Sequence, residues 1–261
     1  MIYFIGAGPG AEDLITVRGK NLLEQADLII YAGSLVNPGL LKYAKPECVI
    51  MNSAHMTLEE VIAAMVPAAQ EGKLVVRLHT GDPSVYGAHR EQIDLLRGYN
   101  LDYEIVPGVS SFCAAAAALK AEYTLPNISQ SVIITRMEGR TPVPSRQKIA
   151  DYAQHKATMV IFLSSGMLEK LSQELIKGGY KADTPAAIVY KASWPDEKVV
   201  KCTVGTLAES AAQYGINKTA LITVGGFLGN EYDRSELYNP TFAHGFREAD
   251  PSKLDLKPEV K

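Results

Sequence analysis

Cysteine, long apolar runs and clusters of basic residues are all scarce in this 261-residue chain, and each scarcity excludes a class of protein. The three cysteines, Cys48, Cys113 and Cys202, are far apart and odd in number, which argues against a disulfide framework or a zinc site. No apolar run reaches about 18 residues, so we expect no membrane span. The N-terminus lacks the basic and apolar segments of a secretory signal, and we expect a cytoplasmic protein.

Charge and motif content narrow the choice further. The net charge is −3 and no basic run is long enough to hold a phosphate backbone, so we expect no nucleic-acid partner. None of the five histidines follows the spacing of a metal site, so we expect no metal. The chain also lacks a GxSxG elbow, a CxxC pair and a Walker loop. If the protein is an enzyme, its chemistry must depend mainly on the positioning of two reactants.

Short apolar segments alternate with segments of helical spacing along the first 120 residues. Strands are expected over residues 2–5, 27–31, 49–51, 74–78 and 103–106, and helices over 19–25, 58–70, 86–97 and 110–119. Thr57 and Glu60 have the spacing of a capping box at the start of one helix. The alternation predicts an N-terminal α/β domain, residues 1–120, on a mostly parallel sheet.

The pattern starts again after residues 121–130, which we interpret as a linker. Strands are expected over residues 131–135, 158–163, 186–190, 197–204 and 220–224, and helices over 145–154, 167–176 and 207–214. A short turn with Trp194 separates two of these strands, so they should form a hairpin. This predicts a mixed sheet in a C-terminal α/β domain, residues 131–233. Residues 234–261 are polar and aperiodic, and we interpret them as a loose tail that a partner subunit could order.

Glycine-containing loops follow three of the expected strands of the first domain: Gly6-Ala7-Gly8-Pro9-Gly10, Gly81-Asp82-Pro83 and Pro107-Gly108-Val109-Ser110-Ser111. Small ligands bind at such strand-to-helix loops, because backbone groups and a helix N-terminus converge there. The first loop imitates a dinucleotide fingerprint, but Pro9 has no N–H for a pyrophosphate, which disfavours a dehydrogenase. We interpret the first loop as a Gly-Pro turn that lets another backbone or a ligand lie against the sheet edge. An ordinary capped turn remains the alternative for the second loop, and a capping role for Ser110 is the alternative for the third.

Taken in this order, the three loops resemble those of the tetrapyrrole (corrin/porphyrin) methylases, together with Leu14-Ile15-Thr16-Val17-Arg18-Gly19. The resemblance covers nearly the whole chain. It implies two α/β domains with S-adenosylmethionine (SAM) folded into the cleft between them, and S-adenosylhomocysteine (SAH) as product. It also implies a small-molecule tetrapyrrole substrate and a homodimer.

The resemblance further implies which residues contact SAM. In the first domain these are Pro9, Gly81, Asp82, Val85, Ser110 and Ser111. In the second domain they are Leu163, Ala187, Thr219 and Ala220. Relatives that methylate uroporphyrinogen tend to carry Met where this chain has Leu163, and Leu keeps the wall apolar.

Segments outside the shared loops are similar to one branch of the family, which methylates carbon 11 of a corrin precursor, with or without cobalt, in vitamin B12 synthesis. These segments are Tyr31-Ala32-Gly33-Ser34-Leu35-Val36, His55-Met56-Thr57-Leu58, Ala192-Ser193-Trp194-Pro195-Asp196-Glu197 and Leu237-Tyr238-Asn239-Pro240. Another corrin-ring or uroporphyrinogen methyltransferase, an RNA methylase of the same superfamily and a non-catalytic SAM-binding protein are the alternatives. An RNA methylase would need a basic face, which the composition lacks.

Methyl transfer from SAM to an already nucleophilic ring carbon needs mainly alignment, which can contribute about 7–11 kcal/mol. Asp82, with His79 behind it, is the candidate base, and orienting the macrocycle is an alternative role for Asp82. The carboxylates of the substrate call for local positive charge. The candidates are Arg18, Arg90, Arg136, Arg140 and Lys191, each of which could instead be a solvated surface charge.

Overall fold

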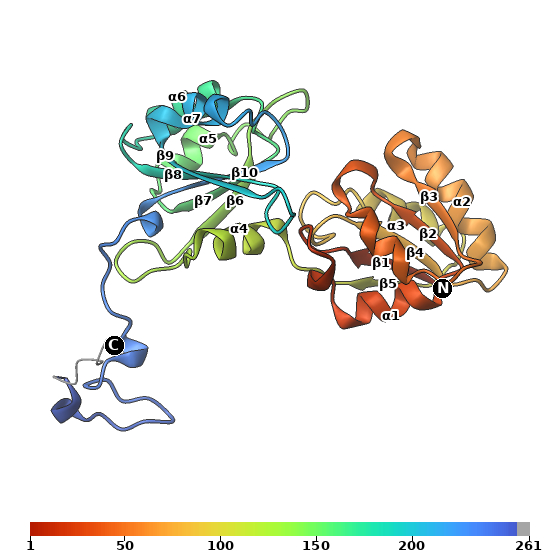
Figure 1. Cartoon of the computed structure of the whole chain (residues 1–261), viewed down its shortest axis with the longest axis horizontal. Coiled ribbons are helices and arrows are strands. Elements are labelled where there is room, and N and C mark those ends of the chain that lie inside the picture. Colours follow the sequence, from red (N-terminus) through yellow and green to blue (C-terminus); the bar gives the residue numbers. More distant parts are fainter. Residues whose placement is uncertain (255–261) are drawn as a thin grey trace. The chain divides into compact units, whose positions relative to one another are not determined.

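Two five-stranded sheets organise the protein, whose structure is a computed structural model that describes residues 1–254 (Figure 1). Residues 255–261 of the expected tail lie outside the described residues. One compact unit holds residues Met1–Lys120, Ile188–Val200 and Ala211–Leu221, and the other holds Ala121–Ala187, Lys201–Ser210 and the chain from Ile222 onward. The domain limits expected from the sequence stay a prediction, because this grouping assigns two later segments to the first unit.

The first sheet has the strand order β3-β2-β4-β1-β5, and every pair in it is parallel. Its strands are β1 (Ile2–Gly6), β2 (Leu28–Tyr31), β3 (Val49–Asn52), β4 (Val75–His79) and β5 (Tyr103–Val106). The helices are α1 (Val17–Gln25), α2 (Leu58–Gln70), α3 (Arg90–Arg97) and α4 (Ser111–Leu119). Because the strands are parallel, the loops after β1, β4 and β5 leave the sheet at the same edge.

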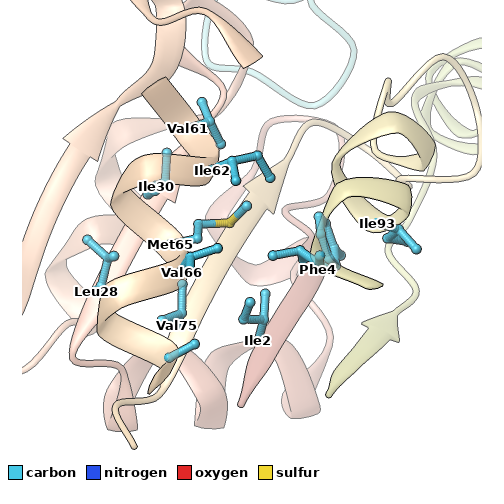
Figure 2. Close-up of a cluster of buried hydrophobic side chains, with 12 residues drawn as sticks. Ile2, Phe4, Leu28, Ile30, Val61, Ile62, Met65, Val66, Val75 and Ile93 are labelled. Atoms are coloured by element: carbon cyan, nitrogen blue, oxygen red, sulfur yellow. The ribbon is translucent and has the colours of Figure 1, made fainter. Parts of the chain in front are cut away.

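Alternate residues of the strands pack on opposite faces of the first sheet. Ile2 and Phe4 of β1 lie in one cluster with Met65 of α2 and Ile93 of α3 (Figure 2). Ile5, the next residue of β1, belongs to a second cluster on the other face. Each fully buried side chain of this size contributes about 1.5–3 kcal/mol, so the two clusters fix the sheet that positions the loops.

The start of α2 shows how local sequence sets a boundary. The Thr57 hydroxyl accepts a hydrogen bond from Glu60 N at 3.3 Å, and Glu60 Oε2 accepts one from Thr57 N at 2.7 Å. The predicted capping box is therefore confirmed, and α2 has the predicted bounds. A cap of this kind contributes about 1 kcal/mol.

The second sheet has the order β6-β7-β10-β8-β9. Its strands are β6 (Val132–Arg136), β7 (Thr158–Phe162), β8 (Pro185–Tyr190), β9 (Lys198–Thr203) and β10 (Ala220–Val224). The helices are α5 (Ile149–Ala153), α6 (Leu168–Lys177) and α7 (Leu207–Gln213). β6 and β7 pair parallel, whereas β10 and β7 pair antiparallel, which confirms the predicted mixed sheet.

Two helices are shorter than the sequence predicts. α3 begins at Arg90 and not at residue 86, because Tyr86 and Ala88 adopt left-handed φ angles of 56° and 47° that a helix cannot contain. α5 begins at Ile149 and not at residue 145, because Lys148 is extended. The loop between β4 and α3 is therefore longer than expected.

The segment from Arg234 to residue 254 holds two short 3-10 turns, Glu236–Tyr238 and Pro251–Lys253. The Arg247 guanidinium organises it by donating to the carbonyl oxygens of Leu237 and Asn239 at 2.9 and 2.8 Å. Its ordering by a partner subunit stays a prediction. Within residues 1–254, none of the helices combines the length and the apolar character needed to cross a bilayer.

Candidate functional site

The loops after β1, β4 and β5 are in direct backbone contact. Gly8 N donates to Gly81 O at 3.2 Å, and Gly81 N donates to Gly8 O at 2.8 Å, which forms an isolated antiparallel bridge. A Cβ on Gly6 would lie 2.5 Å from Gly108 Cα and from Gly81 O. Glycine is therefore required at this junction, because no side chain fits between the loops.

Three predicted SAM contacts, Gly81, Ser110 and Ser111, lie together. A Cβ on Gly81 would be 3.5 Å from Ser110 Cα and from Ser111 N, and Gly81 itself has a φ of +60°. Ser110 is the N-cap residue of α4, yet its side chain makes no capping hydrogen bond. The Ser110 hydroxyl therefore does not have the capping role that was its alternative interpretation.

Asp82 connects two of these loops. Its Oδ1 atom accepts hydrogen bonds from Ser84 N at 2.8 Å and from the Ser84 hydroxyl, while its Oδ2 atom accepts one from Gly108 N at 2.8 Å. Val85 follows in the same turn, with Val85 N donating to Asp82 O at 3.3 Å. Burial alone would raise the pKa of Asp82, but the hydrogen bonds from Ser84 and Gly108 outweigh it and hold that pKa below its ordinary value.

His79 is buried beneath this loop with 3% of its surface exposed. Its ring stacks on Phe4 at 5.9 Å and meets His89 edge-on at 6.0 Å. Burial lowers the pKa of His79 to about 3, and the nearby positive charge of Arg77 adds to the effect. The imidazole is therefore neutral at physiological pH, and its Nε2 atom has no hydrogen-bond partner.

Arg77 supports the same region from the centre of β4. Its side chain is 6% exposed, with Nε donating to Gln92 Oε1 and Nη1 donating to Ile30 O, both at 3.1 Å. Gln92 in turn donates to Ala88 O at 3.0 Å. A buried chain of hydrogen bonds thus links β2, β4 and α3 to the left-handed turn after Asp82.

Three residues outside the predicted site hold the first glycine loop. Trp194 Nε1 donates to Pro9 O at 3.0 Å, Asn37 Nδ2 donates to Gly10 O at 2.8 Å, and Ala11 N donates to the Ser193 hydroxyl at 3.0 Å. A Cβ on Gly10 would collide with the Trp194 ring. In the sequence, the group Ala192 to Glu197 resembles one branch of the family, and its pattern gives no sign of a contact with this loop.

The remaining predicted SAM contacts belong to the second sheet. Leu163 directly follows β7 and Thr219 directly precedes β10, with φ angles of 52° and 55°. Because β7 and β10 are antiparallel, both residues stand at the same end of that sheet. The Leu163 side chain is 64% exposed, which is high for an apolar residue. Its left-handed backbone conformation also costs about 1–2 kcal/mol. Ala220 begins β10, and Ala187 is fully buried in β8.

The predicted substrate cations differ in their partners. Arg18 pairs with Glu104, and Arg90 and Lys191 pair with Asp94 and Asp196 at 2.9 and 2.7 Å. Arg136 donates to the carbonyl oxygens of Thr141 and Pro142 at 3.2 and 2.7 Å. Among residues 1–254, Arg140 has neither an ion-pair nor a hydrogen-bond partner, so its charge is available. Residues 1–254 contain no group of three His, Cys, Asp or Glu side chains placed to hold a metal ion.

Comparison with known proteins agrees with this arrangement of loops. The family described as Tetrapyrrole (Corrin/Porphyrin) Methylases matches residues 1–208. The cobalt-precorrin-4 C(11)-methyltransferase of Methanocaldococcus jannaschii is 55% identical over 249 residues, which are 95% of this chain and 96% of that protein.

Two solved structures extend the comparison. The X-ray structure of a cobalt precorrin-4 methyltransferase superposes with a TM-score of 0.86 at 51% identity, over 88% of this chain and 96% of that one. Uroporphyrin-III C-methyltransferase from Thermus thermophilus, complexed with SAH, gives a TM-score of 0.73 at 26% identity, over 87% of this chain and 92% of that one. With this match over most of its length and this set of converging loops, the chain belongs to the tetrapyrrole (corrin/porphyrin) methylases.

Proposed function

We propose that this protein transfers one methyl group from SAM to carbon 11 of precorrin-4 or its cobalt complex, in the synthesis of vitamin B12. The observation that carries the proposal is the match over 95% of the chain to a cobalt-precorrin-4 C(11)-methyltransferase. The segments Tyr31 to Val36 and Ala192 to Glu197 resemble the same branch, and substrate contacts are expected to diverge there within the family.

The residues of the first unit fit SAM. Thr80, directly before Gly81, has a buried hydroxyl oxygen without a hydrogen-bond partner, and such an atom favours a polar ligand. Gly81 leaves room beside Ser110 and Ser111 where a side chain would intrude. When bound, SAM supplies an electrophilic methyl group on a sulfonium centre. We expect it to be held by Pro9, Gly81, Asp82, Val85, Ser110 and Ser111, with Leu163, Ala187, Thr219 and Ala220 from the second sheet.

The protein's own residues contribute position and charge. The backbones of Gly6, Gly81 and Gly108 pack closely together, which favours one arrangement of the reactants. Arg140 is the first candidate for a substrate carboxylate, because its guanidinium is free of other partners. Arg18, Arg90, Arg136 and Lys191 could serve the same purpose after exchanging their present partners.

The geometry bears on His79 as a candidate base. A neutral His79 with a pKa of about 3, buried under the loop, is a poor proton acceptor in this conformation. These observations argue against a proton-accepting role for His79 and leave Asp82 as the other candidate.

The assembly and the location are also part of the proposal. We expect a homodimer, with the segment from Arg234 to residue 254 in contact with the partner, and we expect the protein in the cytoplasm. Phe246 in that segment is fully exposed in the single chain, and contact with a partner subunit would remove its apolar surface from water. Light scattering should give twice the chain mass of 28.3 kDa at micromolar concentration, and a particle of 28.3 kDa would contradict the dimer.

The proposed reaction is tested by mass spectrometry of the tetrapyrrole after incubation with SAM. Precorrin-4, its cobalt complex and uroporphyrinogen III are supplied in separate reactions. One added methyl on either form of precorrin-4, and none on uroporphyrinogen III, is the expected result. Methylation of uroporphyrinogen III alone would indicate another branch, and SAH binding without any methylation would indicate a non-catalytic SAM-binding protein.

A further inference from the structure

The two carboxylate oxygens of Asp82 face two different segments of the chain. Oδ1 is occupied by the backbone N–H and the hydroxyl of Ser84, within the loop that follows β4. Oδ2 receives the backbone N–H of Gly108 at 2.8 Å, in the loop that follows β5. One side chain therefore ties together loops that are 26 residues apart in sequence.

Both loops carry residues of the proposed SAM site. Gly81 immediately precedes Asp82, and Ser110 and Ser111 follow Gly108 by two and three residues. The space beside Gly81 is bounded by Ser110 Cα and Ser111 N, each 3.5 Å from the position of a Cβ. The distance between the two loops therefore sets the width of the place where a ligand would lie.

We propose that Asp82 is a positioning residue whose carboxylate holds the loop after β4 against the loop after β5 and thereby sets the shape of the SAM site. This inference rests on the proposed function for the identity of the ligand. It gives Asp82 a role in ground-state binding, in place of the proton transfer or ring orientation expected from the sequence.

The chemistry of the group agrees with this role. Three donors satisfy the carboxylate, two of them backbone N–H groups, and such hydrogen bonds stabilise the ionised form. A general base is most effective when its pKa is near the working pH. These hydrogen bonds lower the pKa of Asp82 and so move it away from that pH. The same contacts make Asp82 well suited to fix backbone positions, since hydrogen bonds to a charged acceptor are stronger than neutral ones.

Asp82→Asn is the first test variant, since the amide keeps the shape but cannot accept hydrogen bonds at both ends. We expect the Kd for SAH, measured by calorimetry, and the KM for SAM to rise at least tenfold. At saturating SAM, kcat should fall less than threefold, and the acid limb of its pH profile should be unchanged. The exposed Asp102→Asn, beside the opposite end of β5, is the matched control and should keep the wild-type Kd and kcat.

Ser84→Ala is the second variant, and it removes the hydroxyl donor while the backbone donors remain. We expect a three- to fivefold rise in the Kd for SAH with kcat unchanged. Because this variant alters only one contact, it keeps the proposal testable if Asp82→Asn does not fold, which far-ultraviolet circular dichroism would reveal.

The proposal is overturned if kcat falls by a larger factor than SAH affinity in Asp82→Asn, or if SAH affinity is unchanged in both variants. These outcomes differ from a failure of the proposed function. If the wild-type protein binds SAH but methylates no form of precorrin-4, the reaction is wrong and the SAH affinities still test the role of Asp82. If the wild-type protein does not bind SAH, both the proposed function and the proposed role of Asp82 are wrong.

Discussion

The indole Nε1 of Trp194 donates a hydrogen bond to the carbonyl oxygen of Pro9 at 3.0 Å, across 185 residues of sequence. The ring lies where a side chain on Gly10 would be, so the pair Trp194 and Gly10 is one packing unit. The contact fixes the first glycine loop by means of the turn between β8 and β9. Trp194 is also the single tryptophan of the chain, which makes its fluorescence a direct report on this contact.

Two substitutions of Trp194 should therefore lower the free energy of unfolding by different amounts. Trp194→Phe keeps an aromatic ring but leaves Pro9 O without its donor, and should cost about 1 kcal/mol of the free energy of unfolding. Trp194→Ala also empties the space beside Gly10 and should cost about 3 kcal/mol. Urea unfolding followed by circular dichroism measures both. Exposed Tyr214→Phe is the control, and equal unfolding midpoints for wild type and Trp194→Phe would show that the hydrogen bond contributes nothing.

Gly81→Val should abolish SAH binding in a protein that still folds. The left-handed φ of +60° makes any side chain at this position cost about 1–2 kcal/mol, and the new Cβ would lie against Ser110 and Ser111. Gly72→Val is a matched control, because Gly72 has a φ of +80° and no atom within 4 Å of its Cβ position. Both variants should lose similar stability by urea unfolding, and calorimetry should detect SAH binding only in Gly72→Val. SAH binding by Gly81→Val with wild-type affinity would mean that the ligand lies elsewhere.

His79 should make the protein less stable in acid. The unfolded chain binds a proton at His79 near pH 6.5 and the folded chain only near pH 3, so the unfolded state binds more protons between these values. The contribution of His79 to the free energy of unfolding is therefore fully present above pH 6.5. It falls by about 1.4 kcal/mol for each unit of pH below that value. Urea unfolding measures the free energy of unfolding at pH 7.5 and at pH 5. The decrease between these two pH values should be about 2 kcal/mol larger in wild type than in His79→Leu.

Exposed His155→Gln is the control for this pH dependence and should keep the wild-type loss. The account of His79 would be contradicted by a His79→Leu variant that loses as much stability as wild type between the two pH values.

Gln92→Ala should destabilise the protein through Arg77. The change removes the acceptor of Arg77 Nε and the donor to Ala88 O, which leaves a buried guanidinium with one acceptor fewer. A hydrogen bond to a charged group contributes about 1.5–3 kcal/mol, and the loss should be of that size. Gln173→Ala, at an exposed position of α6, should change the free energy of unfolding by less than about 0.5 kcal/mol. Similar urea midpoints for the two variants would show that the buried chain of hydrogen bonds does not stabilise the fold.

The elements that sequence could predict are those whose causes are local. Helix α2 has its predicted bounds because the capping box and the spacing of its apolar residues act within the helix itself. The short connection between β8 and β9 predicts a turn, because it is too short for a crossover helix. The loops of the candidate site were found because glycine and proline at strand ends restrict the backbone in a recognisable way.

Contacts between distant segments could not be read from the same pattern. Nothing in the neighbourhood of Asp82 indicates that Gly108 N–H is its partner, and nothing near Pro9 indicates Trp194. The early start expected for α3 was wrong because Tyr86 and Ala88 have no intrinsic preference for left-handed φ. Tertiary structure imposes that conformation, in a turn where a Cβ on Gly87 would overlap the backbone of Pro83.

The position of the new methyl group tests the central claim most directly. The protein is incubated with SAM carrying a carbon-13 methyl group and with cobalt-precorrin-4 or precorrin-4, and the product is examined by carbon-13 nuclear magnetic resonance. We predict a single enriched methyl group whose long-range couplings assign it to carbon 11 of the macrocycle. An enriched methyl group on another ring carbon, such as carbon 17 or 20, would contradict the proposed reaction while leaving membership of the family intact.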